Sequence, residues 1–581
     1  MKIALMTINN FRGIQSGAFY FPLNQRIFCI IGPGDSCKST LLKAVEWCLW
    51  PTWNLYVTDL DFYNGDTTSP IIIEMSVAEI PGELLTEDKF GLYLRNFGAV
   101  AIGAENDEPV DNETSVITIR LTIDNTLEPV WSIISNRTDP RPITQKDRRY
   151  FSFGLIGFEY EKDFVWGRTS VLQLYGGTSR DALHTAYKEA MRAAVEKADL
   201  TALDGATTEI TNIGKEYGVR VAGELSNRLL MQNGSYSTNV GIFEGKVPFI
   251  QRGLGSKRLL SMGLNIRASS DGSLILIDEI ETGLEPYRLC TLINQLRAEF
   301  TNQGQLIFTT HSRSAVCECR ASELFIINEI NGRVSLFPVA QQDALEEVQS
   351  LIRTEPDAFL CKRIIVCEGK TEVGILRAFD DYLYKCKKFR FAYNGVGTAL
   401  GGGGNKFFKL AKLLKKCGYD VCILMDSDLP EEETQKSEME ALGIKVFSWE
   451  TGNSIEEQIF HDSNPKCAEE LIALAIENKG YDSVKARLIN DIENAEAVFI
   501  FGDDSITFSK EVKEDVLISV GRVSKGKWNE KKKRHDGGWY KRIDLGQAVG
   551  EIIFQSGRIK DGSKFMETMN ALGKWVKAND P

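Results

Sequence analysis

The sequence predicts an α/β protein that consists of two successive units. In the first unit, the apolar run 27–31 leads into a glycine-rich turn, and an amphipathic segment begins at Lys38, which is the order strand, loop, helix. In the second unit, the apolar runs 362–367 and 420–425 both end in carboxylates. Ligand sites of parallel sheets lie at such strand ends. Each unit is therefore expected to build its site where a strand meets the following loop.

The turn at 32–40 follows the phosphate-loop pattern G-x-x-x-x-G-K-[ST], except that Cys37 replaces the second glycine. In such a loop, backbone N–H groups and the helix N-terminus face the phosphates, Lys38 reaches the β/γ-phosphates, and Ser39 holds Mg²⁺. If position 37 needs a positive φ, its side chain costs about 1–2 kcal/mol. The sequence predicts ATP binding and leaves hydrolysis open. The predicted nucleotide-binding residues here are Gly32, Gly34, Lys38, Ser39 and Thr40.

Composition limits the classes of protein to consider. At about 150 residues per domain, a chain of 581 residues has room for three or four domains. The net charge of −12 argues against a uniformly basic nucleic-acid binder, so DNA contacts would come from local basic patches. The twelve cysteines form no C-x-x-C pair, which suggests reduced, intracellular thiols. With neither a signal-peptide pattern nor an apolar stretch of about 20 residues, we expect a cytoplasmic protein without membrane contact.

The first unit is expected to begin with a strand at 3–8 and a turn at 10–13, in which Arg12 lies either near a nucleotide or simply on the surface. Four apolar segments separated by polar turns then predict an antiparallel β layer. These segments are 71–75, 116–121, 130–134 and 150–158. From about 180 to 233 the period becomes helical, with alanine-rich faces between Ala186 and Ala198. Either ordinary packing or a helical arm that pairs two subunits would produce this pattern.

Downstream, small residues and a serine (Gly253, Gly255, Ser256) precede a helix, as in an anion site. The apolar strand 273–277 then ends in Asp278 and Glu279. Strand alternation would direct these carboxylates to opposite sides, which suits Asp278 for ordering Mg²⁺-bound water and Glu279 for polarising an attacking water. A turn at 282–286 and a further strand at 305–310 follow, and this strand ends at His311.

The second unit carries its carboxylates at two strand ends. Glu368 follows the first strand, and Glu372 lies one helical turn further on, so that both can face one point. Asp426 and Asp428 follow the second strand. Four clustered carboxylates repel one another unless cations lie between them, and oxygen ligands suit Mg²⁺ or Mn²⁺. The alternative to a metal site is that these carboxylates are solvated caps of the following helices. Glu456 provides a further acidic position.

A basic segment lies near the C-terminus. Between Arg522 and Arg542 there are nine lysines and arginines, interleaved with Trp528, Trp539 and Tyr540. This composition predicts a phosphate-backbone surface with stacking groups, although the run 531–534 suits a solvated loop nearly as well. Lys541 directly precedes an amphipathic helix, a position suited to neutralising a pentavalent phosphate.

The motif order of the first unit resembles an ABC-class ATPase head of the SMC/RecF type, and the second unit resembles a Toprim domain, which is a Rossmann-like fold. Together they resemble the OLD (overcoming lysogenisation defect) nucleases, including the Gabija nuclease subunit and retron-associated effectors. The resemblance implies ATPase segments at 1–175 and 239–345, a helical dimerisation insert at 176–238, and a Toprim domain at 346–581. It also assigns the signature segment to Gly253, Gly255 and Ser256, and the switch histidine to His311.

The resemblance further implies two-metal hydrolysis of DNA. The implied metal ligands are Glu368, Glu372, Asp426, Asp428 and Glu456, with Lys541 as the transition-state stabiliser. The expected function is an endonuclease of antiphage defence, controlled by the ATPase head and assembled as a homodimer or higher oligomer. The expected partner is a helicase-like protein or a reverse transcriptase with its nucleic acid. The alternative is a RecF/SMC-like DNA-binding ATPase with a non-catalytic Toprim scaffold.

Overall fold

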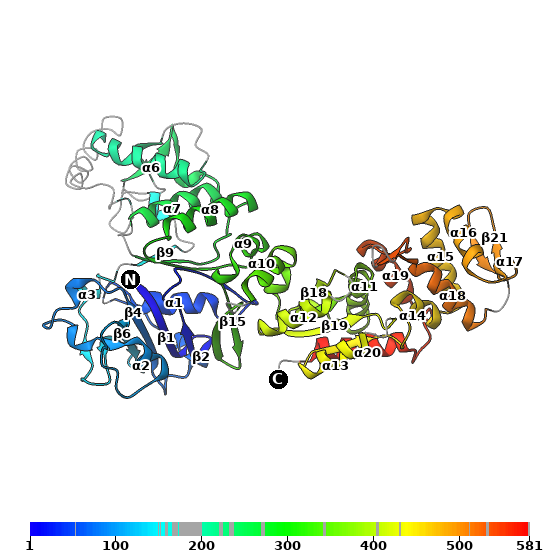
Figure 1. Cartoon of the computed structure of the whole chain (residues 1–581). Coiled ribbons are helices and arrows are strands. Elements are labelled where there is room, and N and C mark those ends of the chain that lie inside the picture. Colours follow the sequence, from blue (N-terminus) through cyan, green and yellow to red (C-terminus); the bar gives the residue numbers. More distant parts are fainter. Residues whose placement is uncertain are drawn as a thin grey trace. The chain divides into compact units, whose positions relative to one another are not determined.

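The structure is a computed structural model of the whole chain (Figure 1). It describes residues 1–52, 54–148, 150–151, 153–156, 161–164, 172, 200–219, 225–231, 238–268, 273–340, 344–402, 406–428, 432–509, 512–529 and 534–578. The chain divides into two compact units, Met1–Gln349 and Ser350–Pro581, and each is considered by itself. In the described parts of the chain, no helix combines the length and apolar character needed to cross a membrane.

The first unit is organised around one large mixed sheet. Its strand order is β8-β7-β6-β4-β1-β2-β16-β15-β3-β14-β13-β9, and β5 pairs with β6. The strands are β1 (Lys2–Phe11), β2 (Ile14–Tyr20), β3 (Ile27–Ile31), β4 (Ile71–Ala78), β5 (Arg95–Asn96), β6 (Ser115–Ile123), β7 (Pro129–Ile134), β8 (Arg141–Pro142), β9 (Phe153–Ile156), β13 (Leu274–Ile277), β14 (Gln305–Thr309), β15 (Leu324–Ile330) and β16 (Arg333–Pro338).

The predicted antiparallel layer is confirmed for three of its four segments. Strands β4, β6 and β7 pair antiparallel and continue the sheet from β1. The fourth segment differs, because β9 pairs parallel with β13 and belongs to the nucleotide-binding half of the sheet. Its period resembles that of the other strands, so only the pairing partner distinguishes it.

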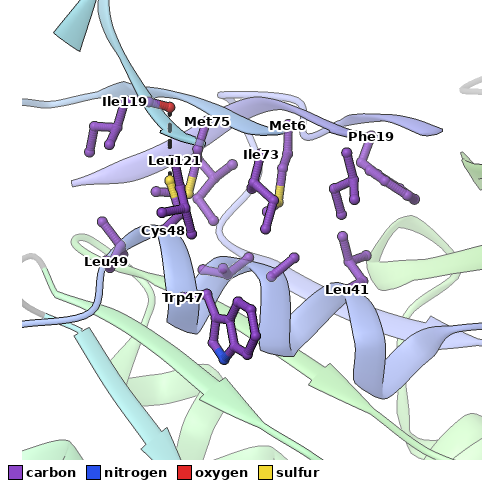
Figure 2. Close-up of a cluster of buried hydrophobic side chains, with 14 of the residues drawn as sticks. Met6, Phe19, Leu41, Trp47, Cys48, Leu49, Ile73, Met75, Ile119 and Leu121 are labelled. Carbon is purple, nitrogen blue, oxygen red and sulfur yellow. Dashed lines mark hydrogen bonds between the residues drawn. The ribbon is translucent and has the colours of Figure 1, made fainter. Parts of the chain in front are cut away.

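Helix α1 (Lys38–Cys48) covers this sheet next to the phosphate loop. Its residues Leu41, Val45 and Cys48 are fully buried, as the amphipathic pattern predicts. Figure 2 shows Leu41 and Cys48 beneath the strands, with Cys48 beside Ile119 and Leu121 of β6. This packing anchors the helix whose first turn carries Lys38.

The segment between the two halves of the sheet contains both helix and strand. Helix α6 (Asp204–Glu216) is present, but the prediction of continuous helix to residue 233 is wrong, because β10 (Leu225–Met231) is a strand. It pairs antiparallel with β11 (Thr238–Glu244), which also pairs with β12 (Val247–Pro248). The alanine-rich stretch from Ala186 to Ala198 lies outside the described residues, and the dimerisation insert stays a prediction.

The described part of the first unit contains further helices. They are α2 (Phe97–Ile102), α3 (Gln145–Arg148), α7 (Leu254–Ala268), α8 (Pro286–Glu299), α9 (Arg313–Glu318) and α10 (Leu345–Thr354), the last of which runs into the second unit. Helix α8 begins with Pro286 at its first position, where the missing N–H costs no hydrogen bond.

The second unit contains a parallel sheet in the order β18-β17-β19-β20. The strands are β17 (Arg363–Cys367), β18 (Val396–Leu400), β19 (Asp420–Met425) and β20 (Lys445–Ser448), connected by α11 (Lys370–Lys387), α12 (Lys406–Lys416) and α13 (Glu432–Ala441). The remaining helices are α14 (Ile455–Asp462), α15 (Pro465–Lys479), α16 (Tyr481–Asp491), α17 (Ala495–Val498), α18 (Glu514–Lys525), α19 (Ile543–Ile553) and α20 (Lys564–Lys577). Two hairpins, β21–β22 (Phe499–Phe501, Ile506–Phe508) and β23–β24 (Lys527–Asn529, Arg534–Asp536), lie among them.

Candidate active sites

The phosphate loop has the backbone conformation that its glycine pattern requires. Cys37 caps α1 in the left-handed region, with φ 67° and ψ 21°. The predicted strain at this position is therefore real, and it costs about 1–2 kcal/mol. Gly13 makes room for the side chain, since a Cβ at residue 13 would lie 2.8 Å from the Cys37 Sγ. The glycine of the first turn thus gives the Cys37 side chain room but leaves its backbone strain in place.

Lys38 lies inside the loop. Its ammonium donates hydrogen bonds to the carbonyls of Gly32 (3.0 Å) and Pro33 (2.6 Å) and to the Ser36 hydroxyl (3.2 Å). Burial lowers the pKa of Lys38 to about 8, although nearby carboxylates, Asp278 first, oppose this shift. An ammonium held on carbonyl oxygens gains a stronger partner when a phosphate enters the loop.

Asp278 contacts both the first turn of α1 and the end of β14. Its Oδ1 accepts hydrogen bonds from the hydroxyls of Thr309 (2.6 Å) and Ser39 (3.1 Å). The residues predicted to share one Mg²⁺ are thus brought together. Strand β13 ends at Ile277, so strand alternation does not separate the two acidic residues as predicted. The backbone turns instead, with Glu279 at φ 46°.

Glu281, which the sequence analysis missed, holds the segment that contains His311. Its carboxylate accepts from the His311 N–H and from the Thr310 hydroxyl, both at 2.6 Å. Burial and the charge of Lys38 lower the pKa of His311, so its neutral form is favoured. The Glu279 carboxylate accepts from the Thr282 hydroxyl at 3.2 Å. The sequence pattern that could have indicated a role for Glu281 is its position two residues after Glu279 in the same turn.

The signature segment packs directly on the turn after the acidic pair. A Cβ at Gly255 would lie 2.5 Å from the Gly283 carbonyl, which requires glycine at residue 255. The guanidinium of Arg258, a fully buried side chain on α7, donates to the carbonyls of Asp278 and Glu279, each at 2.6 Å. Arg258 was also missed, and it couples the signature helix to the acidic pair. Ser256 lies half-buried in the first turn of α7.

Arg12 lies in the turn that precedes β2, and its side chain contacts Asp61 and Trp47. Its Nε donates to Asp61 Oδ1 at 2.9 Å, and its guanidinium lies 5.5 Å from the centre of the Trp47 ring on α1. The adjacent Gly13 contacts the Cys37 position as described above. Trp47 lies in the last turn of α1, and 38% of the Arg12 side chain is exposed, so both alternatives left open by the sequence stay predictions.

In the second unit, the two acid-bearing strands are neighbours, as predicted. Strands β17 and β19 pair parallel, with Cys367 opposite Leu424. The carboxyl ends of both strands therefore lie at one edge of the sheet. There the Asp426 N–H donates to the Glu368 carboxylate at 3.0 Å, so the two predicted ligand segments contact each other.

Asp426 is the buried centre of the acidic cluster. Its Oδ1 accepts from the backbone N–H of Ile455 (2.7 Å) and from the indole of Trp449 (3.2 Å). Burial raises the pKa of Asp426 well above its usual range, and the negative charges of its acidic neighbours raise it further. Those neighbours are Glu368, Glu372, Glu456 and Asp428. All five predicted ligand residues are thus brought into one electrostatic cluster.

Two carboxylate oxygens in this cluster are orphaned. Among the described residues, Glu372 Oε2 and Glu456 Oε2 are buried and have no hydrogen-bond partner. Burial raises the pKa of Glu372. Burial acts in the same direction on Glu456, but Lys541, which donates to its Oε1 at 2.7 Å, outweighs it and lowers the pKa of that carboxyl. The same carboxylates raise the pKa of Lys541, although partial desolvation of its ammonium opposes this shift.

The donor set suits a hard divalent cation. It consists of carboxylate oxygens, two of them buried and unpaired, which is the chemistry that Mg²⁺ and Mn²⁺ select. As the side chains stand, no group of three or more His, Cys, Asp or Glu within the described ranges is arranged to hold a metal ion. Lysines supply the positive charge instead: Lys541 at Glu456 and Lys525, which the sequence analysis did not single out, at Asp428.

The predicted stacking surface between Arg522 and Arg542 is wrong for two of its aromatic residues. Trp539 is 1% exposed and Tyr540 is 2% exposed, and the Tyr540 hydroxyl donates to the Leu471 carbonyl at 2.7 Å. Both belong to the hydrophobic core of the second unit, so they cannot stack on bases. The side chain of Trp528 and the run 531–533 lie outside the described part.

Comparisons with known proteins agree with these two sites. Residues 6–150 match a family described as "AAA domain", and residues 107–318 match "AAA domain, putative AbiEii toxin, Type IV TA system". Residues 359–428 match "Overcoming lysogenization defect protein-like, TOPRIM domain". No curated protein matches the chain.

Among solved structures, the chain is similar to SMC head domains. The SMC head bound to the C-winged helix domain of ScpA is 13% identical, with a TM-score of 0.37, and the match covers 59% of this chain and 100% of that one. The head from Thermotoga maritima is 14% identical, with a TM-score of 0.31 and the same coverages. The head from Pyrococcus furiosus, with an extended coiled coil, is 12% identical, with a TM-score of 0.37, and the match covers 60% and 99%.

The fold and the first site define a P-loop ATPase unit, and the second site lies in a Toprim domain. That Toprim domain is of the OLD-like kind, and the matched region contains Glu368, Glu372, Asp426 and Asp428. The chain thus combines AAA-type ATPase domains with an OLD-like Toprim domain, the architecture of a nuclease-type ATPase. The predicted identification is confirmed at this level.

Proposed function

We propose that this protein is a metal-dependent DNA endonuclease whose Toprim domain cuts and whose ATPase unit controls the cutting. The observation that carries the proposal is the buried carboxylate cluster around Asp426, with its two orphaned oxygens and the adjacent ammonium of Lys541. A buried set of like charges is costly unless cations compensate it. A cluster of this kind, at the carboxyl edge of a parallel sheet, is suited to binding a ligand and to catalysis.

Each residue has a separate task in this proposal. The residues that would hold Mg²⁺ or Mn²⁺ are Glu368, Glu372, Asp426, Asp428 and Glu456. When bound, the metal ions would acidify water and neutralise charge on the phosphodiester. Asp426 is oriented by the indole of Trp449 and the N–H of Ile455, so its carboxylate is fixed before substrate arrives. Lys541 stands beside Glu456, where its ammonium can stabilise the extra negative charge of the pentavalent phosphate.

We further propose that ATP acts as the control ligand of the first unit. Bound with Mg²⁺, it would be contacted by Lys38, Ser39 and Asp278, with Glu279 and His311 at the position of the terminal phosphate. Cys37 strains the loop, so slow turnover and a long-lived bound state are expected. In ABC-type heads the signature segment, here Gly255 and Ser256, closes on a second subunit's nucleotide, so a homodimer or higher oligomer is proposed. A role in antiphage defence with a helicase-like or reverse-transcriptase partner, in the cytoplasm, completes the proposal.

Plasmid nicking tests the nuclease. Supercoiled plasmid is incubated with the full chain and Mn²⁺ or Mg²⁺, and conversion to open-circular or linear DNA is followed. Asp426→Ala is expected to abolish conversion, because it removes the carboxylate at the centre of the cluster. Asp482→Ala, an exposed position on α16, is the matched control and should cut like the wild type. No nicking by the wild type, or equal nicking by Asp426→Ala, would remove the nuclease proposal.

A DNA-binding ATPase with a non-catalytic Toprim scaffold is the second candidate. It is favoured by one observation: in the described residues Lys525 and Lys541 pair with the acidic cluster, and no side-chain group stands arranged for a metal. This function predicts ATP-dependent retention of DNA without cleavage. The nicking assay, combined with filter retention of the same plasmid, separates the two.

A further inference from the structure

A second lysine, Lys525, lies in the acidic cluster of the Toprim unit. It is the last residue of α18, and its ammonium forms an ion pair with Asp428 Oδ2 and lies 3.7 Å from Glu457 Oε2. Only 11% of its side chain and 12% of that of Asp428 are exposed. A lysine this buried needs its partners, because an unpaired ammonium would lose its hydration without compensation.

The position of Lys525 is set by rigid surroundings. At Gly521, one turn earlier on α18, a Cβ would lie 2.7 Å from the Glu457 Cα, so α18 and α14 approach each other closely. Glu457 is itself fixed as the third residue of a capping box, in which its carboxylate accepts from the Ser454 N–H at 2.9 Å. On the other side, the Ser524 carbonyl accepts from the Trp539 N–H at 2.8 Å. The ammonium is therefore placed by the end of α18, a helix that packs closely against α14.

The Asp428 carboxylate pairs with Lys525. The backbone just before it is pinned, because the Ser427 N–H donates to the Asn453 carbonyl at 3.0 Å and the Ser427 carbonyl accepts from Gly452. Asp428 sits two residues from Asp426, and the negative charges of the two carboxylates disfavour each other. The ion pair with Lys525 opposes this repulsion and keeps Asp428 in the cluster.

We propose that Lys525 is a positioning residue of the Toprim site: it holds the Asp428 carboxylate in place without metal and yields it to a divalent cation on metal binding. This inference rests on the metal-dependent function proposed above, and it assigns a role to a residue outside the acidic motifs and Lys541. The exchange is electrostatically favourable, since a divalent cation supplies more positive charge than the ammonium beside the same carboxylate, and the ammonium keeps Glu457 as a partner. The released ammonium remains within the cluster, where it adds positive charge near the phosphate.

Metal rescue of stability tests the exchange. Lys525→Met keeps the aliphatic stem and removes the charge. In EDTA its melting temperature should fall about 5–10 °C below that of the wild type, because one partner of a buried pair is lost. In saturating Mn²⁺ most of that deficit should disappear, because the metal takes over the neutralisation of Asp428. Lys525→Arg should retain most of the stability in EDTA.

The matched control is Lys527→Met. Lys527 lies two residues further on and forms an ion pair with Asp491 at 2.8 Å, but its side chain is 71% exposed, so the variant should melt like the wild type in both buffers. Three results would overturn the inference: no deficit for Lys525→Met in EDTA, an equal deficit with and without Mn²⁺, or an equal effect in the control. A wild type whose melting ignores Mn²⁺ would instead contradict the metal-dependent function, and the exchange with it.

Discussion

Replacing Lys541 by methionine removes the positive charge that pairs with the Glu456 carboxylate. The Glu456 side chain is 1% exposed, and its Oε2 is already without a hydrogen-bond partner, so the variant leaves a buried carboxylate uncompensated. Breaking a buried ion pair from one side costs about 3–5 kcal/mol. Because the Lys541 side chain is 42% exposed, water replaces part of the interaction, and we expect a loss of about 2 kcal/mol in the free energy of unfolding.

The loss should depend on pH in a defined direction. In the wild type the pKa of Glu456 is lowered, so its pairing contributes stability above the pKa of an unfolded glutamate and loses it as pH falls through the folded value. In the variant the main influence that opposes burial is gone, so the pKa of Glu456 is raised relative to the wild type. The variant is then penalised at high pH, where folding keeps a buried charge, and relieved at low pH, where Glu456 takes up a proton. The gap between the two proteins should be largest near pH 8 and shrink toward pH 5.

Hydrogen exchange of the α14 amides over a urea series, in EDTA at pH 8, 6 and 5, measures this gap locally in the full chain. Lys574→Met, at an exposed position on α20, is the control and should behave like the wild type. A gap of the same size at pH 8 and pH 5 would refute the electrostatic reasoning and indicate lost packing instead. In parallel, nicking by Lys541→Met is expected to fall about 10²- to 10³-fold, as on removal of a transition-state donor.

Three further predictions concern other parts of the chain. Cys37→Gly relieves the left-handed strain of about 1–2 kcal/mol and should raise the rate of ATP turnover about tenfold. If turnover is fast in the wild type and unchanged in the variant, Cys37 is neutral. Because the pKa of Lys38 is lowered to about 8, ATP binding above that pH should take up a proton, which calorimetry in two buffers of different ionisation enthalpy detects; no uptake at pH 8.5 would contradict it. Arg363→Met should loosen the end of α20, because its Nη1 donates to the carbonyls of Trp575 (2.6 Å) and Ala578 (2.9 Å); unchanged amide exchange there would contradict this.

Much of the architecture could be predicted from the sequence because it is encoded locally. The phosphate loop lies between β3 and α1 as its pattern requires, and the acid-bearing strands β17 and β19 are parallel neighbours. Even the cost of Cys37 follows from local backbone geometry, since φ at this position is set by the loop type. These features depend on residues close in sequence or on a general rule of parallel sheets.

Other features depended on contacts between distant segments, which no local period reveals. Trp539 and Tyr540 have the composition of a stacking surface but are core residues, because the neighbouring helices of the second unit cover them. Strand β9 resembles the antiparallel strands near it, and only its partner β13 assigns it to the parallel half. Periodicity describes which face of an element is apolar, but not which element covers that face.

In the Toprim site, too, some features could be predicted from the sequence and others only from the tertiary structure. The sequence by itself determined that carboxylates converge at one sheet edge and that Lys541 precedes a helix. Only the tertiary structure decided which cations meet them: Lys525 reaches Asp428 from α18, 97 residues away in sequence, and Lys541 reaches Glu456 across 85 residues. The reason is physical. The energy of a buried ion pair depends on how far its charges are desolvated and on the distance between them. Both are fixed only when the helices have packed.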